Sequence, residues 1–225
     1  MTDLRRTERT RVKRMHERGR YAFDDVASIL DAGFLCHVGY VIDGQPFVTP
    51  TSYWREGDHV YWHGSSASRM LRTQEQGVDV CFTVSHVDGF VLARAAFHHS
   101  INYRAVMLLG KAHKVEDEAA KLQALENFVE RLFPGRWNEL RPATKQEVKA
   151  TTVLSMRIEE GSAKLRTGPP KDDEEDYTWP VWAGVVPVQT VSKPVVRDER
   201  QTAEVAVPAY LADLSHLGVK REGTT

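Results

Sequence analysis

The order of apolar and polar residues between positions 34 and 115 predicts a series of short β-strands joined by tight turns. Asp43-Gly44 and Glu56-Gly57 have the composition of hairpin turns, and another short turn is expected at 87–89. Closely spaced strands with such turns favour an antiparallel barrel or sandwich. The expected strands cover 34–42, 46–54, 59–62, 78–86, 89–95 and 103–115.

Helical signals flank this strand-rich region. The clearest helix is 117–132, whose apolar residues repeat along one stripe and which Pro134-Gly135 ends. Thr144 and Glu147 form a capping box at the start of a shorter helix. Before the strands, Asp24 is expected to cap a short amphipathic helix.

The rest of the chain continues the β-rich pattern and then becomes polar. We expect a strand over 151–158, a polar loop over 161–178 and a closing strand over 182–191. The fold class is therefore mainly β with helices. Composition divides the chain into a basic N-terminal arm (1–20), a central domain (21–191) and a polar C-terminal tail (192–225).

The stretch 61–71 reads as a strand, a tight turn and the start of a helix. Ser65 or Ser66 is expected as the N-cap of a helix over 68–76. Backbone N–H groups, hydroxyls and the guanidinium of Arg69 would meet at one point, and together they suit a phosphate. We therefore predict that this turn holds the phosphate of a cofactor. A capped helix with a solvated arginine would show the same pattern.

Composition narrows the possible locations and partners. The 225 residues carry a formal net charge of −1, which gives no overall attraction to nucleic acid or to a membrane. No apolar run is long enough to cross a membrane and no secretory signal is visible, so we expect a cytoplasmic protein. Cys36 and Cys81 lie in apolar strands and are expected as buried thiols. The basic arm suits a partner subunit better than nucleic acid.

The segment 97–104 is unusually polar for a connection between two apolar strands. It contains the adjacent His98 and His99, followed by Asn102 and Tyr103. Adjacent histidines suit a metal, but no carboxylate or cysteine lies at ligand spacing nearby, so no metal site is expected. We expect this segment to line the functional site and contact a cofactor or substrate, with an ordinary polar strand as the alternative.

Taken together, these residues resemble the FMN-binding split-barrel family related to pyridoxamine 5'-phosphate oxidase, in the branch of the nitroimidazole-resistance (Nim-type) proteins. The resemblance implies a six-stranded antiparallel split β-barrel with flanking helices. It also implies a homodimer with two FMN sites at the subunit interface. The matching residues are 39–51, His63-Gly64-Ser65, Ser68-Arg69-Met70, 97–104 and 182–187, in order across most of the chain.

Individual site residues follow the family's pattern in part. The oxidases bind the flavin phosphate with a Ser-Arg-Lys motif. Ser68-Arg69 matches its first two residues, but Met70 stands in place of the lysine. Thr49-Pro50-Thr51 replaces a basic residue of the oxidases, which argues against pyridoxamine phosphate as the substrate. His63 matches the histidine that Nim-type proteins place beside the flavin.

The residues themselves suit a flavin in the same places. Thr49 and Thr51 share one face of a strand, where their hydroxyls can bond the polar edge of a flavin ring. Trp182 is expected to cover the ring, with a core or dimer role as the alternative. The candidate proton donors, because histidine titrates near neutral pH, are His63, His98 and His99.

We therefore predict an FMN-dependent oxidoreductase that acts on a small organic substrate at the flavin. No catalytic triad or carboxylate pair is evident, which suits chemistry that the cofactor carries. The competing prediction is a module that binds or senses a flavin, a deazaflavin or heme without turnover, since histidine is a common axial ligand of heme.

Overall fold

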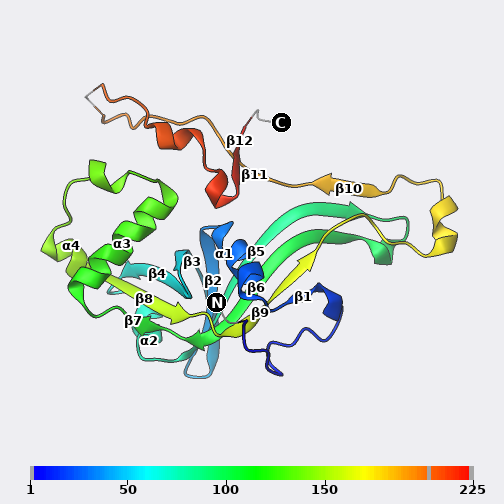
Figure 1. Ribbon diagram of the computed structural model, residues 1–225, viewed down its shortest axis with the longest axis horizontal. Helices are drawn as coiled ribbons and strands as arrows, with labels where there is room; N and C mark the ends of the chain where they lie inside the picture. Colours follow the sequence, from blue (N-terminus) through cyan, green and yellow to red (C-terminus); the bar gives the residue numbers. More distant parts are fainter. Residues whose placement is uncertain (1–2, 202–203, 223–225) are drawn as a thin grey trace.

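The computed structural model describes residues 3–201 and 204–222, and most of its strands belong to one strongly curved antiparallel sheet (Figure 1). The strand order is β1-β9-β6-β5-β2-β3-β4-β8-β7, and β10 pairs with β5 beside this path. The strands of this sheet are β1 (Gly19–Arg20), β2 (Leu35–Ile42), β3 (Gln45–Glu56), β4 (His59–Ser65), β5 (Asp79–Leu92), β6 (Ser100–Lys111), β7 (His113–Lys114), β8 (Thr151–Arg157), β9 (Glu160–Arg166) and β10 (Gly184–Pro187).

Four α-helices and six short 3-10 helices accompany the sheet in the described ranges. A separate two-stranded parallel sheet joins β11 (Thr190–Ser192) to β12 (Val219–Arg221). The α-helices are α1 (Phe23–Asp31), α2 (Arg69–Gln74), α3 (Glu118–Leu132) and α4 (Lys145–Ala150). The 3-10 helices are η1 (His16–Arg18), η2 (Ala96–His98), η3 (Trp137–Glu139), η4 (Glu174–Thr178), η5 (Ala209–Ala212) and η6 (Ser215–Leu217).

The sheet curls into a half-barrel because β3 pairs with different strands along its length. Its first part, up to Ser52, pairs with β2, and its last part, from Tyr53, pairs with β4. The barrel interior holds alternate residues of these strands together with one face of α1. This architecture confirms the expected mainly-β split barrel. Residues of the interior include Val38, Val60, Trp62, Phe82, Leu108, Ile29 and Leu30.

A second, smaller apolar cluster lies on the other face of β3, β4 and β8, beneath α3. Trp54 is stacked on Tyr61, with ring centroids 5.4 Å apart, and Phe128 of α3 packs against Trp54 at 5.1 Å. α3 begins as expected, since Asp117 caps it by accepting a hydrogen bond from the backbone N–H of Ala120. The capping box expected at the start of α4 is likewise confirmed.

The second half of β5 and the first half of β6 form an arm that extends away from the barrel together with β10 (Figure 1). The short turn expected at 87–89 is therefore wrong: β5 continues through it. Its register against β6 shifts between Val87 and Gly89, so a β-bulge replaces the turn. β10 pairs with β5 along this arm, so the closing strand expected over 182–191 is confined to Gly184–Pro187, with β11 following it.

Two other local expectations were wrong. The polar loop expected over 161–178 begins with β9, whose small residues Gly161, Ser162 and Ala163 are all buried between β6 and β1. Small residues carry little strand signal, which hides this strand in the sequence. Asp24 lies inside the first turn of α1, and Ala22 occupies the N-cap position without a side-chain hydrogen bond.

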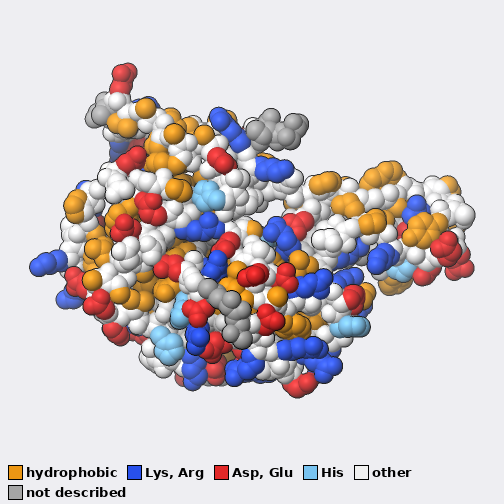
Figure 2. Space-filling model, in the orientation of Figure 1, with side chains coloured by type: hydrophobic (Ala, Val, Ile, Leu, Met, Phe, Trp, Pro, Cys, Tyr) orange, Lys and Arg blue, Asp and Glu red, His pale blue; other side chains and the backbone are white. Residues whose placement is uncertain are grey.

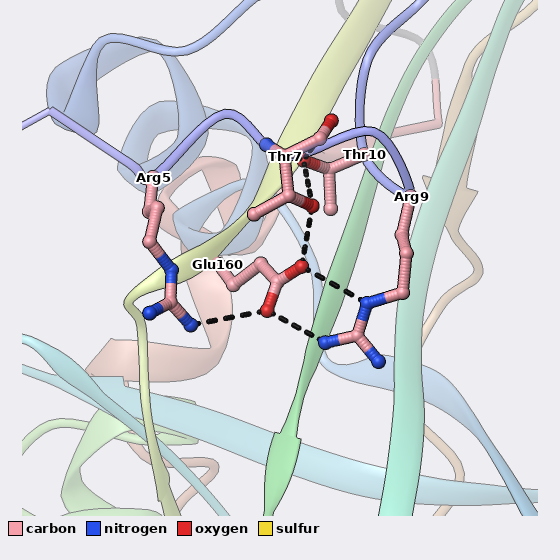
Figure 3. A network of polar contacts seen from close by, with 5 residues as sticks. All are labelled: Arg5, Thr7, Arg9, Thr10 and Glu160. Carbon is pink, nitrogen blue, oxygen red and sulfur yellow. Dashed lines mark hydrogen bonds and ion pairs between the residues drawn. The ribbon is translucent and has the colours of Figure 1, made fainter.

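The N-terminal arm packs on β9 through a buried carboxylate (Figure 3). Glu160 accepts hydrogen bonds from Thr7 at 2.6 Å and from Arg9 at 2.8 Å, and it forms an ion pair with Arg5 at 3.2 Å. Leu4 is buried beside this network. Two arginines of the arm, Arg5 and Arg9, thus share one carboxylate within the chain.

The C-terminal segment packs back on the body of the molecule. The guanidinium of Arg131 donates to the backbone oxygens of Asp31 and His216, and Leu217 and Val219 are buried. Charged side chains of both signs are interspersed over the face shown in Figure 2, while apolar side chains gather along the arm over β10. No helix in the described ranges is long and apolar enough to span a membrane.

Candidate functional site

The predicted phosphate turn lies between β4 and α2, and its hydroxyls are arranged differently from the expectation. Ser68 is the N-cap of α2, so the assignment of Ser65 or Ser66 is wrong. The hydroxyl of Ser65 instead accepts a hydrogen bond from the backbone N–H of Ala67 at 3.2 Å. The Ser68 side chain makes no capping bond, and α2 ends at Gln74. The Ser68 hydroxyl is therefore available to a ligand.

Arg69 presents an exposed guanidinium beside the β2–β3 hairpin. Its Cζ lies 4.8 Å from the centroid of the Phe47 ring, and Phe47 is stacked on Tyr40 at 5.7 Å. The hydroxyls of Tyr40 and Thr49 are 3.2 Å apart. Through these contacts the structure brings Arg69 and Thr49 to one corner of the barrel. Within the described ranges no carboxylate pairs with Arg69, which leaves its charge available to an anion.

Met70 takes no part in this polar corner, because it is buried in the barrel core. The Met70 side chain is therefore not placed to contact a phosphate at the surface. The neighbouring Arg72 is used within the turn, where its Nε donates to the backbone oxygen of Ser66 at 2.8 Å. Arg69 is therefore the cation of this turn that is placed to meet a ligand.

The predicted residues of β3 divide between the two faces of the sheet. Thr49 and Thr51 lie opposite Val38 and Cys36, whose side chains are buried in the barrel. Pro50 points to the other face and is exposed. Only part of the set Thr49, Pro50 and Thr51 can therefore face one ligand.

His63 packs beneath α3. Its ring lies 4.6 Å from the ring of Phe128 and 5.8 Å from that of Trp54, measured between centroids. Burial lowers the pKa of the imidazole, so the ring is neutral at pH 7. Its Nδ1 is buried without a hydrogen-bond partner in the described part of the chain. The aromatic rings around His63 come from β3 and from α3, so the spacing of residues along the chain could not predict these contacts.

The remaining predicted residues lie on the arm. His98 contacts Asp172 and Asp173 at 3.6 and 3.9 Å, and Nδ1 of His99 lies 3.1 Å from the backbone oxygen of Ala95. Asn102 is buried, where its side-chain oxygen accepts a hydrogen bond from Arg166. Tyr103 is half-buried on β6, and Trp182 is largely exposed just before β10.

The carboxylates near His98 come from a loop that is distant in sequence. His98, Asp172 and Asp176 place possible ligand atoms within 4.8 Å of one another. Asp172, however, already accepts hydrogen bonds from the side chain of Arg94 at 3.0 Å and from two backbone N–H groups. A guanidinium in contact with the central carboxylate neutralises it, so this cluster fits an ion-pair network better than a metal site.

The structure thus separates the predicted site into two groups. One lies around the start of α2 and on the neighbouring strands, and the other lies on the arm, which points away from α2 in Figure 1. No hydrogen bond, ion pair or ring contact in the described ranges joins the two groups. Phe47 and Tyr40, which orient the first group, and Asp172, which anchors the second, were not predicted from the sequence.

Comparisons with known proteins identify the family and the fold of this chain. A family model described as pyridoxamine 5'-phosphate oxidase matches residues 23–165. The structure is similar to the flavocytochrome Anf3 from Azotobacter vinelandii, with 51% sequence identity, coverage of 91% of this chain and 95% of that chain, and a TM-score of 0.88. Comparison with curated proteins gives no match.

Two further solved structures show the same fold. The FAD and heme binding protein from Mycobacterium smegmatis is 33% identical, with coverage of 86% of this chain and 95% of that chain and a TM-score of 0.83. A structure described as a 5-nitroimidazole antibiotic resistance protein, from Bacteroides thetaiotaomicron, is 22% identical, with 65% and 86% coverage and a TM-score of 0.54. The last likeness concerns the fold alone.

Proposed function

Because the chain belongs to the pyridoxamine 5'-phosphate oxidase family, whose split barrel binds flavin, we propose that it is a flavin-dependent oxidoreductase that also binds heme. The observation that carries this proposal is the 51% identity to a flavocytochrome over 91% of the chain. The similar M. smegmatis protein, described as binding FAD and heme, supports the same pair of cofactors. We propose FAD as the flavin in place of the FMN expected from the sequence.

The residues around α2 fit the anionic part of a flavin. The guanidinium of Arg69 has no ionic partner in the described ranges, and the hydroxyl of Ser68 is free of capping bonds. Charge-assisted hydrogen bonds from such groups are among the strong interactions with phosphate. Thr49, close to Arg69 through Phe47 and Tyr40, offers a hydroxyl to a more distant part of the same ligand.

A bound flavin and heme supply two-electron and one-electron transfer, and the protein contributes position, charge and access. The neutral His63 fixes the end of β4 by packing against α3. Proton donation by His63, His98 and His99 remains a prediction. Thr49-Pro50-Thr51 in place of a basic residue of the oxidases argues against pyridoxamine phosphate as the substrate, and Met70 in place of their lysine removes one cation from the phosphate site.

We also propose a homodimer in which the arm of one subunit reaches the flavin of its partner. Two observations support it. The predicted site residues fall into two groups that one chain does not bring together. The arm also exposes apolar side chains, including Phe90 and Trp182, which are 51% and 64% exposed. Large exposed apolar patches commonly mark interfaces, and twofold homodimers are the commonest oligomers.

The proposal is tested by the absorbance spectrum of the purified protein, with mass spectrometry of the compounds released on denaturation. Flavin bands together with a Soret band, and release of FAD and heme, are the expected result. The released mass separates FAD from FMN and from a deazaflavin. A colourless protein that takes up neither added FAD nor added hemin would overturn the proposal.

A further inference from the structure

A cavity of about 530 Å³ lies between the C-terminal segment, the start of β2 and the middle of β5. We infer that this cavity holds the heme and that His37 is its axial ligand. The inference rests on the proposed function and assigns a residue of this chain to the heme. The volume of the cavity falls in the range of ligand pockets, roughly 300–1,000 Å³.

The walls of the cavity suit a flat apolar group. Phe34, Leu35 and Val87 line it from the sheet side, and they are 40%, 51% and 44% exposed. Together they form an exposed apolar patch beside the cavity, and such patches often mark a ligand or partner site. The opposite wall comes from the C-terminal segment and includes Val188, Leu217 and Val219.

His37 has the position that an axial ligand requires. It lies on β2 and lines the cavity, and its side chain is exposed. Its ring makes no hydrogen bond, ion pair or ring contact with any residue in the described part of the chain. Only the backbone oxygen of His37 is used, as an acceptor for the hydroxyl of Thr83 at 3.2 Å. Both ring nitrogens are therefore available, and imidazole is a common axial ligand of heme iron.

Other histidines of the described ranges are placed less well. His63 is packed between aromatic rings beneath α3. His86 lines the same cavity, but its Nε2 lies 3.0 Å from the backbone oxygen of Ile29. His113, whose ring also has no partner in these ranges, lines a cavity whose wall is mostly charged and polar. Five more are engaged in hydrogen bonds or ion pairs: His16, His59, His98, His99 and His216.

Cations in the cavity wall match the two carboxylates of a heme. Arg104 lines the cavity and is paired with Asp88 at 2.8 Å, so its guanidinium is held in a fixed place. Lys220 of β12 lines the opposite side, is exposed and has no ion-pair partner in the described ranges. A carboxylate near either cation would gain a charge-assisted hydrogen bond.

The position of His37 also relates the heme to the flavin. His37 is the cross-strand partner of Pro50, which lies between Thr49 and Thr51 on β3. Directly opposed residues of antiparallel strands lie roughly 4.5–5.5 Å apart at Cα and project from the same face. The heme ligand would therefore lie one strand away from Thr49 and Thr51, on the opposite face of the sheet from these two threonines.

The test compares the full-length wild type with His37→Gly and with the matched control His113→Gly, which alters another unpartnered histidine. Heme content, Soret position and the electron paramagnetic resonance spectrum are measured on each purified protein after addition of hemin. We expect His37→Gly to bind hemin about tenfold or more weakly and to lose the histidine-ligated spectrum. Added imidazole should restore that spectrum, and His113→Gly should match the wild type.

Two results separate this inference from the function on which it rests. A wild type that binds no heme overturns the proposed function, and the assignment of His37 falls with it. A wild type that binds heme, with an unchanged spectrum in His37→Gly, overturns the assignment of His37 alone. Loss of flavin with heme retained in that variant also overturns it. Should the glycine variant fail to fold, His37→Gln keeps a polar side chain and carries the same expectation.

Discussion

At the scale of single residues, Glu160 and Arg69 show that a charged side chain can serve either the fold or a ligand. The side chain of Glu160 is only 4% exposed, and its oxygens are occupied by the N-terminal arm (Figure 3). Arg69 is exposed and has no ionic partner in the described part of the chain. The first arrangement stabilises the fold, because an ionised carboxylate is buried only when it is paired. The second leaves a cation available to a ligand.

Replacement of Arg69 should weaken flavin binding while leaving the fold intact. We expect Arg69→Ala to bind flavin roughly tenfold or more weakly, because a charge-assisted contact to phosphate is lost. Flavin fluorescence titration measures the change. Arg6→Ala is the matched control, since Arg6 is also exposed and also lies over an aromatic ring, that of Tyr21 at 5.1 Å. Equal affinities for the two variants would contradict the phosphate assignment.

Replacement of Glu160 should lower stability in a manner that depends on pH. Hydrogen bonds from Arg9 and Thr7 hold the pKa of the Glu160 carboxyl below its ordinary value. A lowered pKa in the folded state stabilises the protein above the ordinary pKa of glutamate, about 4.3, and this contribution is lost as the pH falls through the lowered value. At pH 7, Glu160→Gln should reduce the free energy of unfolding by about 1–3 kcal/mol.

Urea unfolding of the wild type and Glu160→Gln at pH 7 and at acidic pH measures this difference. The gap between the two proteins should narrow as the pH falls, since the wild-type carboxyl becomes protonated. Glu159→Gln is the control, because Glu159 is 55% exposed and pairs only with the exposed Arg157 among the described residues. A gap that stays constant between neutral and acidic pH would contradict the ion-pair explanation.

At the scale of elements, close backbone approach determines which strands can be neighbours. β9 lies between β6 and β1, and Gly161 lies opposite Leu108. A Cβ atom at Gly161 would lie 2.5 Å from the backbone oxygen of Met107 and 2.7 Å from a methyl of Leu108. A real side chain cannot occupy that space unless the strands move apart. The small residues that hide β9 in the sequence are therefore needed for its packing.

Gly161→Ala should destabilise the barrel by about 3 kcal/mol, at the upper end of typical overpacking costs. Thermal unfolding monitored by circular dichroism measures this effect. Gly39→Ala on β2 is the control, because the added Cβ would meet its nearest neighbour at an ordinary distance of 3.6 Å. If both variants unfold at the same temperature, the proposed close packing of β9 on β6 is incorrect.

At the scale of the whole molecule, the separation of the predicted site into two groups leads to the proposal of shared sites. In a homodimer of this kind each flavin would meet Ser68 and Arg69 of one subunit and Trp182 of the other. A substitution in either group, at the start of α2 or on the arm, would then weaken both flavin sites of a homodimer. In a heterodimer of two variant chains, the flavin content depends on whether the two substitutions fall in the same site or in different sites.

Mixing of two variants therefore tests the shared site. A heterodimer of Arg69→Ala and Trp182→Ala chains would have one doubly damaged site and one intact site, so its flavin content should be about half that of the wild type. The control heterodimer of Arg69→Ala and Ser68→Ala chains would have one lesion in each site and should stay depleted. A different affinity tag on each of the two chains allows each heterodimer to be purified. Equal loss of flavin from the two heterodimers would contradict a site shared between subunits.

Features that depend on neighbours in sequence were predicted well. The hairpin at Asp43-Gly44 has φ values of 49° and 79°, as its turn type requires, and the capping box at Thr144 is present. The caps expected at Asp24 and at Ser65 or Ser66 were wrong, since Ala22 and Ser68 hold those positions. The resemblance to the flavin-binding family was also confirmed. The bulge in β5 and the strand at Glu160–Arg166 were missed, because pairing with distant strands rather than local preference creates them.

The sequence by itself determined the split barrel, the hairpin at Asp43-Gly44, the capping box at Thr144 and the family, since these follow from local pattern and from a run of matching residues. Only the tertiary structure decided where the site residues lie. It brought Arg69 to Thr49 by way of Phe47, turned His63 beneath α3, and carried His98 and Trp182 onto the arm. These placements depend on strand register and on contacts between distant segments, which residue spacing along the chain does not encode.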